Sequence, residues 1–362
     1  MKQLNIILIP FFFLCLKNTH AQCNGHESLC DKTYKEVAYL TTHNAYNSAQ
    51  DEFMAPNQTY GITQQLEDGV RGLMIDVYDV EGVPTVYHGF SFLGTAPFAD
   101  NLFEIKNFLT ENATEVVTII LECYTTANAI EQALADAELS DFLYAKNGDW
   151  ATLREMIDNN QRLVILTDVD DASPAQNWYH YVWDYAVETH YSISDTSQMT
   201  CDYNRGNPWN DLFIFNHFVT HPTFGTGLPI ESEIANSNPF LLNRVLECQE
   251  EKSKFPNFIT VDYYEKGNTL QVVNTLNGVI TSTLSVQEKE VYCFPNPADN
   301  LLTISGFNNT FTYDLYDTTG KLWQNGSSNG TIQLSGLPNN IYLLNVQTNS
   351  EKHHFKIIKI GE

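Results

Sequence analysis

Basic side chains are scarce in this chain of 362 residues. It contains 19 Lys and Arg against 44 Asp and Glu, which gives a formal net charge of −25. A nucleic-acid partner requires a basic surface that neutralises phosphates, and so does long-range attraction to an anionic membrane. The composition therefore argues against nucleic-acid binding and allows only peripheral contact with a membrane surface.

Long apolar runs are also missing after the first twenty residues. Lys2, the stretch NIILIPFFFLCL and the site Thr19-His20-Ala21 are typical of a signal peptide over residues 1–21. This run is too short to span a bilayer comfortably, and no later run is long enough. We therefore expect an exported protein.

Cysteine is infrequent, with six residues after position 21. An even number in an exported chain permits disulfides, but spacing alone leaves the pairing open. A bridge between Cys23 and Cys30, which closes a short loop, is the first expectation, and one between Cys201 and Cys248 is the second. Cys123 lies in a predicted core strand, where a buried free thiol is the simplest interpretation.

Strand-like runs alternate with helix-like segments from about residue 34 to residue 265. Apolar strands 20–40 residues apart with helices between them indicate parallel β-α-β units. About eight such strands predict an α/β fold, a (β/α)8 barrel of the TIM type with some distortion, over residues 22–270. The expected strands are EVAYLTT, GLMIDVY, PTVYHG, VVTIILECY, RLVILTDV, ETHYSIS, LFIFNHF and FITVDYY, and the expected helices are Ala99–Glu111, Ala127–Ala137, Asp149–Asp158, Asp171–Ala186 and Pro239–Glu251.

The composition changes near Thr269, after which Asn, Thr, Ser and Gly are frequent. The short stretches NLLTISG, FTYDLYD, TIQLSGL and IYLLNVQT alternate with Asn-Pro, Thr-Gly and Asn-Gly turn signals. This pattern predicts a small all-β sandwich over residues 289–362, joined to the barrel by a linker over residues 271–288.

Polar side chains stand where the apolar runs of the predicted barrel end. His43, Asp76, His88 and Glu122 each close such a run, and the carboxyl ends of barrel strands face one another. Two imidazoles, which titrate near neutrality, can serve as general base and general acid in phosphodiester cleavage. The charge that builds on phosphoryl oxygens needs a cation, either Arg or a metal ion. The oxygens of Asn44, Asp76 and Glu122 are ligands of the kind that calcium prefers.

Each of these residues also has a plainer interpretation. A single His at a strand end is usually structural, and Asn44 could simply close a turn. Arg71 could contact phosphate in catalysis or form an ion pair near a strand start. Asp262 could orient His43 through a hydrogen bond, as carboxylates do for catalytic imidazoles. Further candidates for the rim of the site are Asp168 and His217.

Several blocks of the sequence resemble a known family. THNAYN, GVRGLMIDVYD, VYHG and IILECY resemble the X domain of phosphatidylinositol-specific phospholipase C. CDYNRGNP, LFIFNHF and PNFITVDYY resemble secreted members of the phospholipase C-like phosphodiesterase superfamily. The resemblance covers about Cys23 to Asn268. It implies a secreted phosphoric diester hydrolase that cleaves an inositol phospholipid, with His43 as base and His88 as acid.

The same resemblance implies a calcium cofactor held by Asn44, Asp76 and Glu122. The sequence departs from the metal-dependent branch at Met74, where that branch has another acidic ligand. Three ligands are few for calcium, so we expect weak binding or a further side chain in the shell. Basic residues that grip inositol phosphates have no obvious counterparts, which argues against a polyphosphorylated head group.

Two alternatives to this function remain open. One is a glycerophosphodiesterase or sphingomyelinase-like enzyme of the same superfamily, although His43-Asn44-Ala45 lacks the HRG pattern of glycerophosphodiesterases. The other is a non-catalytic surface barrel that binds glycans or lipids.

The C-terminal segment resembles a second family. CFPNPADNLLTISG, YDLYDTTGKLW and IYLLNVQTNSEKHHFKIIKI are similar to the C-terminal sorting domain of the type IX secretion system. An ordinary adhesive β-sandwich is the alternative. The resemblance implies recognition by the type IX secretion machinery, a secreted or outer-membrane surface-attached protein, and no catalytic role for this domain.

Overall fold

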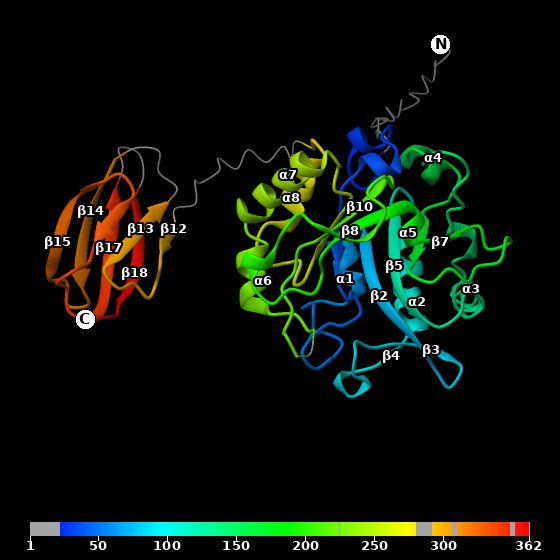
Figure 1. The fold of residues 1–362 in the computed structure, drawn as a ribbon, viewed down its shortest axis with the longest axis horizontal. Coiled ribbons are helices and arrows are strands. Elements are labelled where there is room, and N and C mark those ends of the chain that lie inside the picture. Colours follow the sequence, from blue (N-terminus) through cyan, green and yellow to red (C-terminus); the bar gives the residue numbers. More distant parts are fainter. Residues whose placement is uncertain (1–21, 224, 280–291, 306–309, 348–351, 362) are drawn as a thin grey trace, which may run out of the picture. The chain divides into compact units, whose positions relative to one another are not determined.

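The computed structural model describes residues 22–223, 225–279, 292–305, 310–347 and 352–361. The predicted signal peptide, residues 1–21, lies outside the described residues. The chain divides into two compact units, Met1–Ile280 and Thr281–Glu362 (Figure 1). Within the described ranges, no helix is both long and apolar enough to cross a membrane.

The first unit is built on a curled sheet of parallel strands flanked by helices (Figure 1). The parallel strands pair in the order β7-β6-β5-β2-β1-β11-β10-β8, which is chain order read around a circle. In the described residues β7 and β8 are not paired, and β9 joins the outer edge of β8 in the antiparallel direction. The fold is therefore the expected barrel, distorted by an open seam between β7 and β8. The strands are β1 (Tyr39–Thr42), β2 (Gly72–Val80), β5 (Val117–Tyr124), β6 (Leu163–Thr167), β7 (Tyr179–Tyr181), β8 (Ala186–Thr189), β9 (Tyr203–Gly206), β10 (Leu212–Asn216) and β11 (Phe258–Val261).

Two expected elements differ from the prediction. PTVYHG forms β3 (Val83–Val86), which pairs with β2 in an antiparallel hairpin and is not a barrel strand. The connection Glu81-Gly82 is too short for the crossover that parallel strands require. The segment 171–186 is not one helix but a loop followed by β7 and the single-turn helix α5 (Val182–Tyr185). Its aromatic residues favour extended backbone, and Tyr179 is buried in the core as part of β7.

The helices cover the outside of the sheet. They are α1 (Ile62–Glu67), α2 (Phe98–Glu111), α3 (Ala127–Asp136), α4 (Leu153–Asp158), α6 (Pro229–Ala235), α7 (Phe240–Lys252) and α8 (Thr269–Leu276); a two-residue strand, β4 (Ala96–Pro97), pairs with β3. A capping box formed by Thr152 and Glu155 starts α4 at Leu153, four residues later than expected. Helix α8 lies where the linker was expected, because Val272 and Val273 pack into the barrel core.

Both expected disulfides are present. Cys23 bonds to Cys30, and Cys201 bonds to Cys248. Cys123 is a buried free thiol, as the sequence indicated.

The second unit is the expected β-sandwich. One sheet pairs β12 (Tyr292–Phe294), β13 (Leu301–Ser305) and β16 (Thr331–Gln333), and the other pairs β15 (Leu322–Ser328), β14 (Phe311–Asp317), β17 (Asn340–Gln347) and β18 (Lys352–Lys359). All pairs of these strands are antiparallel. Alternate residues of β14, among them Phe311 and Leu315, are buried in a core of the unit's own.

Gly72 sets the close approach of β1 and β2, beside the strand end that carries His43. It pairs with Thr41, and a Cβ atom at this glycine would lie 2.3 Å from Thr41 Oγ1. We expect Gly72→Ala to lower the free energy of unfolding by about 1–3 kcal/mol through overpacking. Urea denaturation followed by tryptophan fluorescence measures this. Gly72→Ala combined with Thr41→Ala removes the clashing oxygen and should recover part of the loss; equal stability of all three proteins would contradict this account.

Candidate active site

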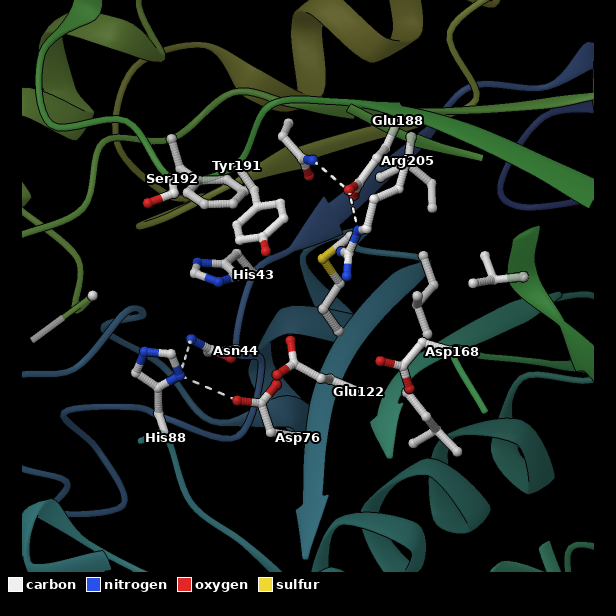
Figure 2. A pocket seen from close by; sticks show the side chains of 18 of the residues that line it. His43, Asn44, Asp76, His88, Glu122, Asp168, Glu188, Tyr191, Ser192 and Arg205 are labelled. Carbon is white, nitrogen blue, oxygen red and sulfur yellow. Dashed lines mark hydrogen bonds and ion pairs between the residues drawn. The ribbon is translucent and has the colours of Figure 1, made fainter. Parts of the chain in front are cut away.

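A cavity of about 240 Å³ opens at the carboxyl ends of the barrel strands. His43, Asn44, Asp76, His88 and Glu122 all line it, so the structure brings these five predicted residues together (Figure 2). They come from four separate stretches of the chain. The barrel therefore assembles the site from residues that are remote in sequence.

His43 follows β1 and is held by a buried carboxylate. β1 pairs with β11 so that Thr42 lies opposite Val261, and the next residues along the two strands are His43 and Asp262. His43 Nδ1 lies 2.9 Å from Asp262 Oδ1, and Asp262 is fully buried. The imidazole also stacks on Phe218, with ring centroids 3.9 Å apart. Because the carboxylate only accepts, Nδ1 carries the proton and Nε2 is left free to accept one.

His88 follows β3 and is paired with a second carboxylate. The β2–β3 hairpin places it beside Asp76, and His88 Nδ1 lies 3.1 Å from Asp76 Oδ2. Burial of the ring favours its neutral form. The hydrogen bond and charge of Asp76, with the charge of Glu122, outweigh burial and raise the pKa of His88. His88 is therefore suited to carry a proton near neutrality.

The two imidazoles lie across the pocket from each other. Their ring centroids are 6.2 Å apart and the rings are almost perpendicular, at 78°. Both side chains retain some exposure, 16% for His43 and 23% for His88, so both are accessible from the pocket. A base and an acid so placed can act on two atoms of one substrate.

Carboxylates form the floor of the pocket. Asp76 and Glu122 are register neighbours on β2 and β5, and Figure 2 shows their carboxylates close together. Burial raises the pKa of Glu122, and the charge of Asp76 raises it further. Burial also raises the pKa of Asp168, which lines the same pocket and accepts a hydrogen bond from the Cys123 amide. This concentration of negative charge favours a bound cation.

The predicted calcium ligands offer only oxygen donors. Asn44 has a left-handed backbone (φ 47) and directs its amide nitrogen to Asn57 Oδ1 at 3.2 Å, so its amide oxygen remains as an acceptor. No group of three or more His, Cys, Asp or Glu side chains within the described ranges has the geometry of a metal site. One amide and the neighbouring carboxylates of Asp76 and Glu122 nevertheless fit the hard-oxygen preference of calcium, with water completing the shell.

Two candidates lie away from the pocket. Arg71 stands at the start of β2, where it binds Glu115 at 2.8 Å and the carbonyls of Leu66 and Val70. Arg71 therefore lies outside the pocket, because the opposite end of its strand faces the site, and it forms the ion pair that was its alternative interpretation. His217 is completely buried, its ring hydrogen-bonds to the Ala235 carbonyl, and burial lowers its pKa to about 3. It is a structural residue.

Sequence reasoning missed the far wall of the pocket. Arg205 on β9 lines it, with its guanidinium 4.5 Å from the Trp183 ring and 4.7 Å from the Tyr191 ring. Its Nε donates to Glu188 Oε1 at 2.5 Å, and Glu188 is almost fully buried. Among the described lining residues Arg205 is the one Lys or Arg. The block CDYNRGNP contained it, but no strand was expected there.

Comparisons with known proteins match both units. The family model PI-PLC X 1 matches residues 29–277, and the model of the secretion system C-terminal sorting domain matches residues 292–360. The second match agrees with the resemblance to the type IX sorting domain, so the protein is secreted or attached at the outer-membrane surface.

Individual relatives are distant. A PI-PLC X domain-containing protein of Arabidopsis thaliana is 28% identical over 276 residues, which cover 68% of this chain and 63% of that protein. PI-PLC X domain-containing protein 1 of Arthroderma benhamiae is 27% identical over 285 residues, covering 71% and 90%. The F249X mutant of phosphatidylinositol-specific phospholipase C from Staphylococcus aureus aligns with a TM-score of 0.48 at 12% identity, over 67% of this chain and 94% of that one.

The pairing of His88 with Asp76 predicts a titration effect. In metal-free protein, Asp76→Asn should lower the pKa of His88, because the hydrogen bond to a charged acceptor is lost. NMR titration of the imidazole in the presence of a chelator measures this. Asp79→Asn is the matched control, since Asp79 is exposed on the same strand and its carboxylate accepts a hydrogen bond from the Gly82 amide. An unchanged His88 pKa in Asp76→Asn would contradict the assignment.

Proposed function

The chain belongs to the PI-PLC X 1 family, and we propose that it cleaves phosphatidylinositol or a related inositol phosphodiester outside the cell. Family and fold together support a phospholipase C-like phosphodiesterase. The observation that carries the proposal is the pair of imidazoles 6.2 Å apart over one cavity, each bound through Nδ1 to a carboxylate.

His43 is the proposed general base. Its Nε2 takes the proton from the substrate hydroxyl next to the phosphodiester, and that oxygen attacks phosphorus to form a cyclic phosphodiester. Asp262 holds the Nδ1 proton and stabilises the imidazolium that results. Stacking on Phe218 fixes the plane of the ring.

His88 is the proposed general acid. It gives its proton to the departing glycerol oxygen as the bond from phosphorus to that oxygen breaks, which yields diacylglycerol and a cyclic inositol phosphate. The raised pKa favours the protonated ring that a general acid needs, and the rate should fall as the pH rises through that pKa.

Two kinds of positive charge can offset the phosphoryl charge. Asn44, Asp76 and Glu122 would hold calcium, which when bound supplies a cation beside the phosphoryl oxygens. Arg205 supplies a guanidinium from the far wall. Because Nε is used by Glu188, the terminal nitrogens of Arg205 are the donors left for the substrate.

The pocket favours a small head group without extra phosphates. Its volume of about 240 Å³ is below the range of roughly 300–1,000 Å³ that drug-sized ligands occupy. Asp76, Glu122, Asp168 and Glu188 all line it, against one arginine. Such a pocket would repel further phosphates, whereas carboxylates and a guanidinium can both hydrogen-bond to the hydroxyls of inositol.

The two histidines should respond differently to the leaving group. His43→Ala and His88→Ala should each lower kcat on phosphatidylinositol by about 10²–10⁴-fold. With a p-nitrophenyl inositol phosphate, whose leaving group needs no proton, His88→Ala should lose much less than His43→Ala. His354→Ala, in the C-terminal domain, is the control and should keep full activity.

The same assay separates the alternative functions. Turnover of glycerophosphodiesters or sphingomyelin but not of phosphatidylinositol would favour another enzyme of the superfamily. Binding of lipid vesicles or of glycans by the wild type, without turnover, would favour a non-catalytic barrel.

Calcium binding is expected to depend on the pocket carboxylates. Isothermal titration with CaCl₂ should show Glu122→Gln weakening affinity by about tenfold or more. Affinity should also weaken as the pH falls, because protons compete for a carboxylate whose pKa is raised. Glu138→Gln, an exposed residue paired with Lys106, is the control. Full turnover in chelator would remove calcium from the mechanism.

A further inference from the structure

One face of helix α7 holds the segment that leads into β9. Arg244, Cys248 and Lys252 are four residues apart, so they lie one above another on the helix. Arg244 Nη2 donates to the Thr200 carbonyl at 2.8 Å, and Cys248 forms the disulfide with Cys201. The Lys252 ammonium lies 3.7 Å from Asp202 and 5.3 Å from the centre of the Tyr203 ring. Four consecutive residues, 200–203, are therefore attached to three successive turns of α7.

The backbone pairing of β9 is short and irregular, although its side chains contact Phe213 and Glu188. Within the described residues its strand partner is β8 alone. Val187 pairs with Gly206 and Thr189 pairs with Tyr203, and the register shifts between these two pairs. Gly206 has φ 84, and a Cβ atom there would lie 2.2 Å from the Ala186 carbonyl oxygen. An irregular two-strand edge with few ladder bonds is the type of element that opens locally.

Arg244 binds this segment to the pocket wall as well. It is buried, and its Nη1 donates to the Asn216 carbonyl and lies 3.0 Å from His217 Nδ1. Burial lowers the pKa of Arg244 to about 10, and His217 stays neutral, so the imidazole can accept the bond. A buried guanidinium is costly, and the carbonyls of Thr200 and Asn216 offset that cost. Asn216 itself lines the pocket.

We propose that Arg244, Cys248 and Lys252, the α7 clamp, position Arg205 in the substrate pocket. Arg205 lies two residues after Tyr203, and its guanidinium fits between Trp183 and Tyr191 only while β9 stays in place. The clamp residues touch the β9 segment and the end of β10, so they act through Arg205 and are positioning residues. The inference rests on the proposed function, because in that function Arg205 contacts the substrate.

The kinetic test compares the two disulfides. Cys201→Ala/Cys248→Ala should raise KM and lower kcat/KM on phosphatidylinositol by about 10–100-fold, because small misplacements of a positioning group cost that much. Arg205→Gln should show a similar loss, and the combined variant should lose little more than either. Cys23→Ala/Cys30→Ala, which removes the other disulfide, should keep wild-type kinetics. Losses that add in the combined variant would overturn the proposal.

Hydrogen–deuterium exchange tests the clamp without turnover. Backbone amides of residues 200–206 should exchange faster in the Cys201→Ala/Cys248→Ala protein, but not in Arg205→Gln or in the Cys23→Ala/Cys30→Ala control. Unchanged exchange in that segment would overturn the proposal. If the double cysteine variant fails to fold, Lys252→Ala takes its place with the same expectation. A wild type without turnover on phosphatidylinositol would refute the proposed function, while the exchange result would still decide the clamp.

Discussion

The parallel register of β11, β1, β2 and β5 is the constraint on which the site depends. It places Asp262 beside His43 and Asp76 beside Glu122, since residues at equal depth in neighbouring strands point the same way. The short hairpin from β2 to β3 then returns His88 to Asp76. A shift of one residue in any of these pairs would turn a side chain of the pocket to the other face of the sheet.

Electrostatics in the pocket follow from that arrangement. Asp76 serves two partners, because it raises the pKa of His88 and also raises that of Glu122. An acidic pocket in an acidic protein is poor at attracting a phosphodiester by itself. In the proposed function, positive charge would be supplied locally by a protonated His88, by Arg205 and by calcium.

The wall of the pocket opposite the histidines lies at the open seam of the barrel. Without a strand bond between β7 and β8, the space is bordered by Trp183 from α5, Tyr191 after β8 and Arg205 from β9. These elements are short and irregular, and the disulfide from Cys201 to Cys248 joins the segment before β9 to α7. The histidine side of the pocket rests on regular strands, whereas the arginine side rests on attachment to a helix.

The sequence by itself determined the elements whose physical cause is local. Buried apolar runs identified β1, β2, β5, β6, β10 and β11, because both faces of parallel strands are buried. His43, Asn44, Asp76, His88 and Glu122 were correctly placed in one pocket, and both disulfides were anticipated. Only the tertiary structure decided that β7, and not β3, is a barrel strand, since this depends on which distant edge accepts a strand. It also moved Arg71 out of the site and brought Arg205 in. Whether an arginine reaches the pocket depends on the direction of its strand and on packing against residues distant in sequence, and no local pattern of residues encodes either.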